Sequence, residues 1–448
     1  MANEKNLTSG KPFSVLWRFT LPVIGGNLFQ LFYTLADSVI VGKTLGANAL
    51  AAVGSTTIII YMVLCFIQGF TGGFGIRLGQ MCGAGREKGM KRSATASWIL
   101  SLAFTLILTG ACCLLAHPIL RWMQTPQEIY QDAYDYMLVI LLGTGATIFY
   151  NIISNMLRAL GDSRVPLYFL IISALLNVVG DLFFVVVLKW GVPGSALATM
   201  LSEALCCLCC AVYIKKKVPL LCLGKKWRVF DSSILWRTFT YGITSALQQM
   251  CVQLGKICVQ TIVNVQGVSF IAAFTAINRV DDFAMTPQQN IAHASTTFMA
   301  QNRGAGKIAR MEKGFLCSIL LELIYTAVVS VLVFVFARPI MGLFVGTDSE
   351  EVVNLGVSYL SLISIMYVMP AATNIIQGFF RGLGDLKVTL ISTILNMSAR
   401  FLGAWVMIHI LHGGFDRLAW ANFVGWIAML AFQIPMFLFR WRKEKQYL

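Results

Sequence analysis

Two short motifs occur twice in this chain at almost the same spacing. Residues 78–85 (LGQMCGAG) return at 299–306 (MAQNRGAG), and residues 158–162 (RALGD) return at 381–385 (RGLGD). The offsets are 221 and 223 residues, close to half of the 448-residue length. The repeat restricts the fold to two similar halves that follow one plan.

The composition is that of a membrane protein. Hydrophobic residues make up 57% of the chain and charged residues 12%, with a mean hydropathy of +0.73, whereas soluble domains have about 25% charged residues. The segments 99–115, 167–188 and 319–337 are nearly free of charge and long enough to cross roughly 30 Å of hydrocarbon. We therefore expect an all-α integral membrane protein. Two repeated halves in such a protein are typical of transporters, whose lobes move about a shared site.

We expect about twelve transmembrane helices, six in each half, related by a pseudo-two-fold axis along the membrane normal. The apolar segments and their Gly, Pro and basic boundaries place them at approximately 13–42, 48–80, 92–117, 128–158, 164–188, 193–216, 233–266, 269–301, 310–336, 350–380, 386–411 and 417–441. The N-terminal lobe is predicted at 1–214, a cytoplasmic linker at 215–231 and the C-terminal lobe at 232–448.

The net charge of +15 is concentrated in alternate connections between these helices. Basic residues gather near 86–92, 158–164, 215–228, 303–313, 381–387 and 440–445, and the intervening connections hold few. This is the positive-inside pattern, and it places both termini in the cytoplasm. It explains the charge without nucleic acid as a partner. We expect a multi-pass protein of a bacterial inner or plasma membrane.

Acidic residues of the first half fall inside the expected helices, where a charged group is costly and needs a partner or a function. Asp37, Asp181 and Thr199 lie six to eight residues from the outer ends of their helices, which is roughly 9–12 Å deep. Asn177 lies one turn deeper than Asp181 on the same face. This set can hold a hard cation, or its carboxylates can share a proton. Glu203, one turn after Thr199, would border it. The alternative is that both aspartates are protonated and purely structural.

The second half carries charges of both signs inside its helices. The repeat places Lys256 where the first half has Asp37, and Arg400 where it has an amide. Asp281 and Asp282 lie within the expected eighth helix. Two interpretations stay open. The charges can compensate one another as ion pairs, or Lys256 or Arg400 can meet an anionic group on a substrate.

Six motifs follow one another along the chain. They are 37–42 (DSVIVG), 79–85 (GQMCGAG), 158–166 (RALGDSRVP), 278–281 (NRVD), 301–307 (QNRGAGK) and 381–385 (RGLGD). In these motifs and their order the chain resembles the multidrug and toxic compound extrusion (MATE) family over nearly its whole length. The resemblance implies twelve helices in two six-helix lobes around a V-shaped cleft, and export of organic molecules by Na⁺ or H⁺ antiport.

The resemblance is closest to the DinF-type branch, and it also implies site residues. In that branch an aspartate of the first helix, an Asn-x-x-x-Asp pair of the fifth and a threonine of the sixth form a cation site. The matching residues here are Asp37, Asn177, Asp181 and Thr199. The family also implicates an asparagine late in the fourth helix, for which Asn155 is the nearest match and Asn151 the alternative.

The same resemblance marks a departure in the second half. The other branch of the family uses acidic residues in the C-terminal lobe, whereas the seventh helix here offers Gln248, Gln249 and Lys256 instead of a carboxylate. Lys256 and the doubled Asp281–Asp282 depart from the usual pattern. We therefore expect a polar site in the C-terminal lobe made from Gln249, Lys256, Asp281, Asp282 and Arg400.

Two functions fit these observations. The first is a secondary active exporter of organic or xenobiotic molecules, driven by Na⁺ or H⁺ antiport through alternating access. The alternative is a flippase for lipid-linked saccharide or peptidoglycan precursors, favoured by the basic residues of the second half. The chain has no nucleophile–base pair and no metal-binding motif, so we expect no enzyme, no cofactor and no metal beyond a coupling Na⁺. We expect a monomer that contacts the lipid bilayer and a small organic substrate, the latter carrying an anionic group under the substrate interpretation of Lys256 and Arg400.

Overall fold

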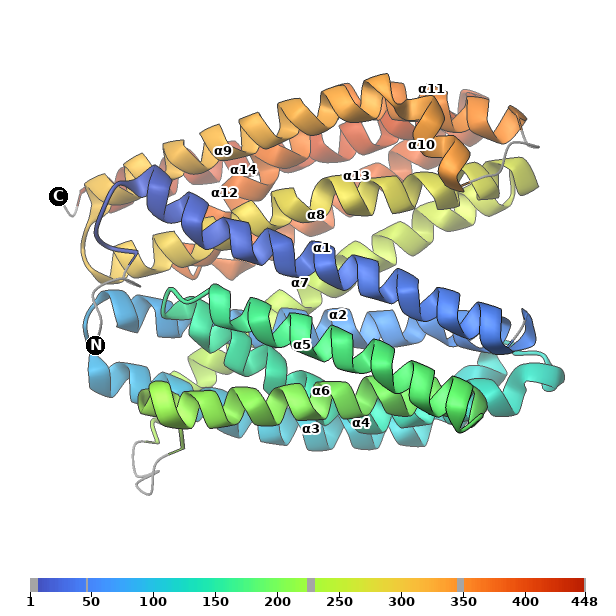
Figure 1. Cartoon of the computed structure of the whole chain (residues 1–448). Coiled ribbons are helices and arrows are strands. Elements are labelled where there is room, and N and C mark those ends of the chain that lie inside the picture. Colours follow the sequence, from blue (N-terminus) through green and yellow to red (C-terminus); the bar gives the residue numbers. More distant parts are fainter. Residues whose placement is uncertain (1–6, 46, 224–229, 345–349, 447–448) are drawn as a thin grey trace. The chain divides into compact units, whose positions relative to one another are not determined.

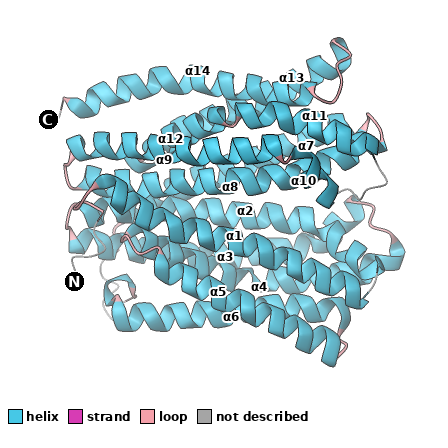
Figure 2. Cartoon of the chain, turned by 45° about the horizontal axis from the view of Figure 1, so that its top comes forward, coloured by secondary structure: helices cyan, strands magenta, loops and turns pink. Residues whose placement is uncertain are grey.

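The computed structural model describes residues 7–45, 47–223, 230–344 and 350–446. Within these ranges, the side chains of residues 32–43, 45, 47, 48 and 50 are not described. The described residues form helices joined by short connections, with no strand among them (Figure 2). The expected all-α class is confirmed.

Two compact units divide the chain, and each is described by itself. The first consists mainly of Leu21–Ala246, and the second of Leu7–Thr20 together with Leu247–Leu448. The division falls within the helices α1 (Pro12–Leu45) and α7 (Ser232–Asn264). Residues 224–229 of the predicted linker between the lobes lie outside the described residues, whereas 215–217 belong to the end of the helix α6 and 219–221 form a 3₁₀ turn. The lobe limits drawn from the sequence stay a prediction.

The twelve predicted helices all have counterparts, most within a few residues of the expected limits (Figure 1). Between α1 and α7 lie α2 (Ala47–Gly83), α3 (Glu87–Trp122), α4 (Gln127–Ala159), α5 (Arg164–Asp181) with a π-helical turn (Leu182–Val187), and α6 (Gly191–Lys217) followed by a 3₁₀ turn (Pro219–Leu221). After α7 come α8 (Val268–Gly304), α9 (Ile308–Val335), α10 (Ala337–Phe344), α11 (Glu350–Met366), α12 (Val368–Leu383), α13 (Leu386–Trp405) with a π-helical turn (Val406–Ile410), and α14 (Arg417–Lys445).

The segment predicted as one helix at 350–380 is broken into α11 and α12, which meet at 47°. Pro370 lies three residues after the break and has no N–H to donate, and its ring would clash with the carbonyl of Met366 in a continuous helix. The carbonyl of Tyr367, at the break itself, accepts a hydrogen bond from Nε2 of Gln288 at 3.3 Å. A side chain of α8 therefore stabilises the interruption.

Eight helices of the described residues are long and apolar enough to cross a membrane, and nine if the bent pair α11–α12 counts as one span. The helices α7 and α8 are also long but more polar, because α7 carries Lys256 and several glutamines and α8 carries Asp281 and Asp282. A multi-pass membrane protein follows from these spans.

The repeated motifs end helices in the same way in both halves. Gly85 and Gly306 have φ of 65° and 69°, and Gly161 and Gly384 have φ of 91° and 80°. At all four sites the glycine amide bonds to the carbonyl three residues earlier, and the next amide bonds to the carbonyl five residues earlier. This is the Schellman cap, in which a residue with positive φ favours glycine. The repeat in the sequence is thus a repeat of helix ends.

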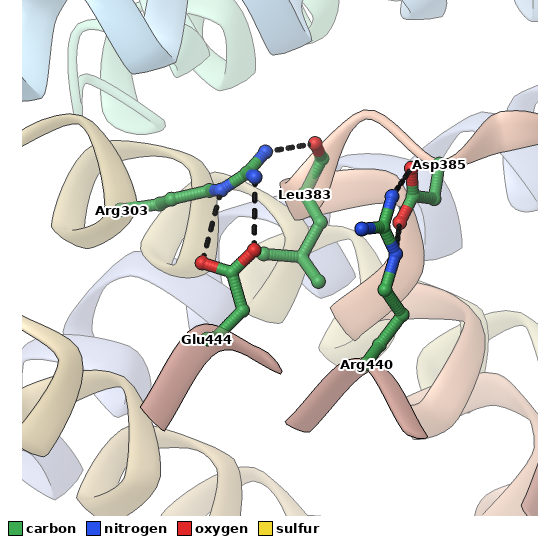
Figure 3. Close-up of polar contacts among 5 residues, drawn as sticks. All are labelled: Arg303, Leu383, Asp385, Arg440 and Glu444. Carbon is green, nitrogen blue, oxygen red and sulfur yellow. Dashed lines mark hydrogen bonds and ion pairs between the residues drawn. The ribbon is translucent and has the colours of Figure 1, made fainter. Parts of the chain in front are cut away.

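At one end of the second unit, ion pairs join residues of these motifs to the helix α14 (Figure 3). Arg303, at the end of α8, pairs with Glu444 of α14 at 2.9 Å and also donates to the carbonyl of Leu383. Asp385, which precedes α13, pairs with Arg440 of α14 at 2.5 Å. These contacts hold the ends of α8, α12, α13 and α14 together. The first unit uses its copy of the acid differently, since Asp162 accepts the amides of the next helix, α5.

The residues before α1 are bound to α8 and α9. The amide of Asn302 and the guanidinium of Arg310 both donate to the carbonyl of Leu7, at 3.3 and 3.2 Å. Arg310 also donates to the carbonyl of Ser9 at 2.6 Å, and Lys307 to that of Thr8 at 2.9 Å. The repeated motif at 301–307 therefore fixes the start of the chain in the second unit.

Within the first unit, α2 and the first part of α7 approach closely along small residues. A Cβ added to Gly73 would lie 2.4 Å from the carbonyl oxygen of Tyr241, and one added to Gly69 would lie 2.7 Å from Cα of Ala246. Glycines four residues apart let helix backbones approach in membranes. By contrast, a Cβ at Gly72 would meet no atom within 4 Å.

We expect Gly73→Ala to lower the thermal unfolding temperature of the purified protein, by an effect of about 1–3 kcal/mol, because the new methyl group must separate α2 from α7. Gly72→Ala is the matched control, and it should leave the unfolding temperature unchanged or slightly higher. Equal effects of the two substitutions would contradict the close approach at Gly73.

Candidate functional site

In the first unit, three polar residues predicted for the cation site lie where α5 meets α6. Asp181 is the last residue of α5 and is fully buried, and Asn177 is 2% exposed one turn earlier. Nδ2 of Asn177 donates a hydrogen bond to Oγ1 of Thr199, on α6, at 2.9 Å. A Cβ added to Gly180 would lie 2.9 Å from Cβ of Ala198. Glycine at this position therefore permits the close approach that brings Asn177 to Thr199.

The chemistry of this corner fits a small cation or a proton. Oδ1 of Asn177 is buried and accepts no hydrogen bond from the part of the chain that the structure describes. An amide oxygen without a donor, a threonine hydroxyl and a buried carboxyl are the oxygen ligands that hard cations prefer. A carboxylate buried at membrane depth needs a positive charge or a proton to neutralise it. The corner is therefore suited to hold Na⁺ or H⁺.

The other residues predicted for this site are placed as follows. Asp37 belongs to α1, and its side chain lies outside the described residues. Nδ2 of Asn155 donates to Oγ1 of Thr71 at 3.3 Å, which directs Asn155 toward α2. Glu203 accepts a hydrogen bond from the hydroxyl of Thr147, which ties it to α4. The structure brings together Asn177 and Thr199, while Asn155 and Glu203 have their hydrogen bonds with other helices.

A π-helical turn follows Asp181 directly, and it has a counterpart after Trp405 in the second unit. Turns of this kind are rare and occur often at functional sites, because they leave backbone groups out of the regular ladder. Neither turn could be predicted from the hydrophobic periodicity. The one in the first unit begins where the buried carboxyl lies, which supports a functional corner at this place.

In the second unit, the predicted charges occur in a group on α7 and α8. Nζ of Lys256 lies 3.2 Å from Oδ1 of Asp282, and each side chain is 41% exposed. Oδ1 of Asp281 accepts a hydrogen bond from the hydroxyl of Tyr367 at 2.7 Å. Lys256 and Arg400 also lie close enough to Asp281 to interact with it electrostatically. The structure therefore brings Lys256, Asp281, Asp282 and Arg400 into one charged cluster.

Gln249 makes no hydrogen bond with any described residue, whereas its neighbour Gln248 is buried in a network. Nε2 of Gln248 donates to Oε1 of Gln377 and to Oγ1 of Thr393, both at 3.1 Å. Arg381 donates to the same oxygen of Gln377. The sequence could not separate the two glutamines, because adjacent residues of a helix face different neighbours only once its packing is set.

A second group of buried polar residues lies on α8 and α9, where the sequence predicts only that Glu322 reaches the membrane surface or forms an ion pair. Gln288 of α8 bonds to Thr326 of α9 at 2.9 Å and to the carbonyl of Tyr367. Glu322, one turn before Thr326, is 1% exposed, and neither of its carboxyl oxygens has a hydrogen-bond partner among the described residues. Two signals were available, namely Glu322 as an acid within an apolar segment and Pro370, which predicts an irregular backbone nearby.

We expect the ion pair between Lys256 and Asp282 to contribute about 0.5–1 kcal/mol to folding, because a half-exposed pair is partly screened. A double-mutant cycle with Lys256→Met and Asp282→Asn, followed by thermal unfolding in detergent, measures this coupling. Additive effects of the two substitutions would show that the pair has no net interaction.

Comparison with known proteins places this geometry in context. A family model described as MatE matches residues 22–183 and 244–406. The chain is 27% identical over 392 residues to the probable multidrug resistance protein YpnP of Bacillus subtilis, covering 87% of each chain. It is 24% identical over 444 residues to the probable multidrug resistance protein NorM of Thermotoga maritima, covering 96% of this chain and 93% of that one.

The fold itself is shared with a solved structure. A MOP superfamily transporter from Pyrococcus furiosus superposes with a TM-score of 0.93 at 23% identity, over 99% of both chains. The expected two-lobe fold is thereby confirmed. The predicted flippase alternative receives no support from these relatives, and the DinF-type branch stays a prediction.

Proposed function

The chain belongs to the MatE family, whose members are transporters, and we propose that it is a secondary active exporter of small organic molecules driven by Na⁺ or H⁺. The relatives named for multidrug resistance support export of such molecules. The observation that carries the coupling is the buried corner of Asn177, Asp181 and Thr199 in the first unit.

The mechanism follows from the cost of burying a carboxylate. Asp181 is fully buried in a helix that is apolar enough to cross the membrane. When it is ionised it needs a cation, and the orphan oxygen of Asn177 with the hydroxyl of Thr199 would complete the ligands. When it is protonated it needs none. Binding of Na⁺ or H⁺ therefore favours one conformation of the corner over another, and in alternating access this difference drives the substrate outward.

Orientation is part of the proposal. The basic residues of the second unit gather at the ends of α8, α9 and α14, as Arg303, Lys307, Arg310, Arg440, Arg442, Lys443 and Lys445. Basic residues at one end of a helix bundle favour the cytoplasmic side. We assign this end to the cytoplasm, with both termini there. In the first unit we assign the end of α6 that carries Lys215, Lys216 and Lys217 to the cytoplasm as well, so that the coupling corner near the start of α6 lies toward the outer side.

We expect Asp181→Asn to abolish export driven by an ion gradient, because a neutral amide neither releases a proton nor neutralises Na⁺. The measurement uses the purified protein in liposomes with Na⁺ and pH gradients imposed separately, and the efflux of the cation ethidium and of the anion FMN as two readouts. Asp132→Asn, an exposed acid on α4, is the matched control and should keep full activity. Undiminished gradient-driven efflux in Asp181→Asn would refute the assigned corner.

The coupling ion is distinguished by binding, without transport. If the ion is Na⁺, saturating Na⁺ in place of K⁺ should raise the unfolding temperature, because ligand at 100 times its Kd stabilises the protein by about 2.7 kcal/mol. Asn177→Leu should remove this shift while the fold persists in K⁺. If the ion is H⁺, the Na⁺ shift is absent and only the pH gradient drives efflux. A full Na⁺ shift in Asn177→Leu would exclude this residue as a ligand.

A further inference from the structure

The corner of α5 and α6 is repeated in the second unit with its chemistry changed. At an offset of 223 residues, Gly180 and Ala198 correspond to Gly403 and Ala421, and a Cβ added to Gly403 would lie 3.5 Å from Cα of Ala421. The helices α13 and α14 are therefore packed at the same small residues as α5 and α6.

The polar residues of this second corner differ from those of the first. At the same offset, Asn177, Asp181 and Thr199 become Arg400, Ala404 and Asn422. The buried carboxyl is gone and a guanidinium has been added. Asn422 is held in place by Tyr359, since its Nδ2 donates to the tyrosine hydroxyl at 2.6 Å. The first corner therefore offers oxygen ligands suited to a cation, whereas the second offers mainly hydrogen-bond donors.

Arg400 is placed by close packing but lacks a direct partner. A Cβ added to Gly425 would lie 3.0 Å from Cβ of Arg400, so α14 passes tightly over the base of this side chain. The guanidinium, half-buried, makes no ion pair or hydrogen bond with any residue that the structure describes. Its five N–H donors therefore have no protein acceptor. Such a group inside a membrane span is costly unless a ligand or water satisfies it.

Lys256 is brought near Arg400 by a second close contact. A Cβ added to Gly255 would lie 2.5 Å from Sδ of Met397, which is one turn before Arg400. The contact joins α7 and α13 next to Lys256 and one turn from Arg400, and both cations interact electrostatically with Asp281. Lys256 and its partner Asp282 are each 41% exposed. Charges at this depth avoid lipid and face water-filled space, so the cluster is accessible to a solute.

We propose that Arg400, together with Lys256, binds an anionic group, a carboxylate or a phosphate, on the exported molecule. This inference rests on the proposed exporter and names the class of its substrate. Guanidinium binds oxyanions through two parallel hydrogen bonds, and a bound oxyanion would satisfy the donors that Arg400 leaves unused. Lys256 can turn from Asp282 to share the ligand, because both side chains are only half-buried.

Ion pairing among the charged residues of the cluster does not explain why Arg400 is there. Two cations and two acids balance in charge, but Asp282 is engaged by Lys256 and Asp281 accepts the hydroxyl of Tyr367. Arg400 acts on Asp281 only electrostatically, without a hydrogen bond. A structural ion pair would place the guanidinium in contact with a carboxylate, as Arg303 and Arg440 are at the other end of the unit (Figure 3).

The test compares ligands that differ in one anionic group. Binding to the full-length protein in detergent is measured for riboflavin and its phosphate FMN, and for the dye tetramethylrhodamine and its methyl ester. We expect at least one anionic member to bind ten times or more tighter than its neutralised counterpart. The phosphate and carboxylate pairs show which group is preferred. Equal affinities within both pairs would overturn the proposal.

Substitutions identify the residues. Arg400→Gln and Lys256→Gln should each reduce the anion preference at least fivefold, whereas Lys256→Arg should keep most of it. Arg338→Gln is the control, because Arg338 is an exposed arginine of α10 paired with Glu350 outside the cluster. A preference retained in both Gln variants, with unchanged unfolding temperatures, would also overturn the proposal.

The experiments distinguish failure of the anion site from failure of the proposed exporter function. Asp181→Asn should lose gradient-driven efflux and keep the anion preference, since the two sites lie on different helices. Gradient-driven efflux of ethidium with no anion preference would leave the exporter standing and refute the anion site. An anion preference without any gradient-driven transport would do the reverse.

Discussion

A charge inside a membrane span must be neutralised, and much of this molecule follows from that cost. An isolated carboxylate or guanidinium in hydrocarbon is disfavoured by several kcal/mol or more, so each buried charge calls for a partner, a proton or a ligand. Lys256 and Asp282 meet the requirement with each other. At the corner of Asn177 and Asp181 an amide oxygen accepts no hydrogen bond from the described residues, and Arg400 makes neither an ion pair nor a hydrogen bond with them, so both places suit a ligand.

The two repeated halves share their backbone geometry but differ in the polar side chains that they carry. Both halves end corresponding helices at glycines with positive φ and pack corresponding helices at small residues. These features depend on backbone geometry, so they tolerate few residue types and survive duplication. The side chains at the α5–α6 and α13–α14 corners are not constrained in this way. Asn177 and Asp181 of the first corner correspond to Arg400 and Ala404 of the second, so the first corner carries an acidic group and the second a basic one.

Much of the fold could be predicted from the sequence, because its signals are local. Long apolar segments bounded by glycine, proline and basic residues gave the helices, and their counterparts are all present. The break at Tyr367 and the π-helical turns were missed, since they arise where a helix must adapt to its neighbours. Asn177 and Thr199 could be placed within about one helical turn of each other by counting residues from the helix ends. The hydrogen bond from Asn155 to Thr71 could not be predicted, because the depth of a residue does not show which neighbouring helix its side chain faces.

The sequence by itself determined that the chain is a helical membrane protein of two repeated halves, and that acids dominate the interior of the first while both signs occur in the second. Those properties depend on composition and spacing along the chain. Only the tertiary structure decided that Gln248 and not Gln249 is buried in a network, that Glu203 bonds to Thr147, and that Arg400 makes no ion pair or hydrogen bond with the described residues. Which groups come within hydrogen-bond distance depends on how neighbouring helices are rotated and how closely they pack, and no spacing along one helix contains that information.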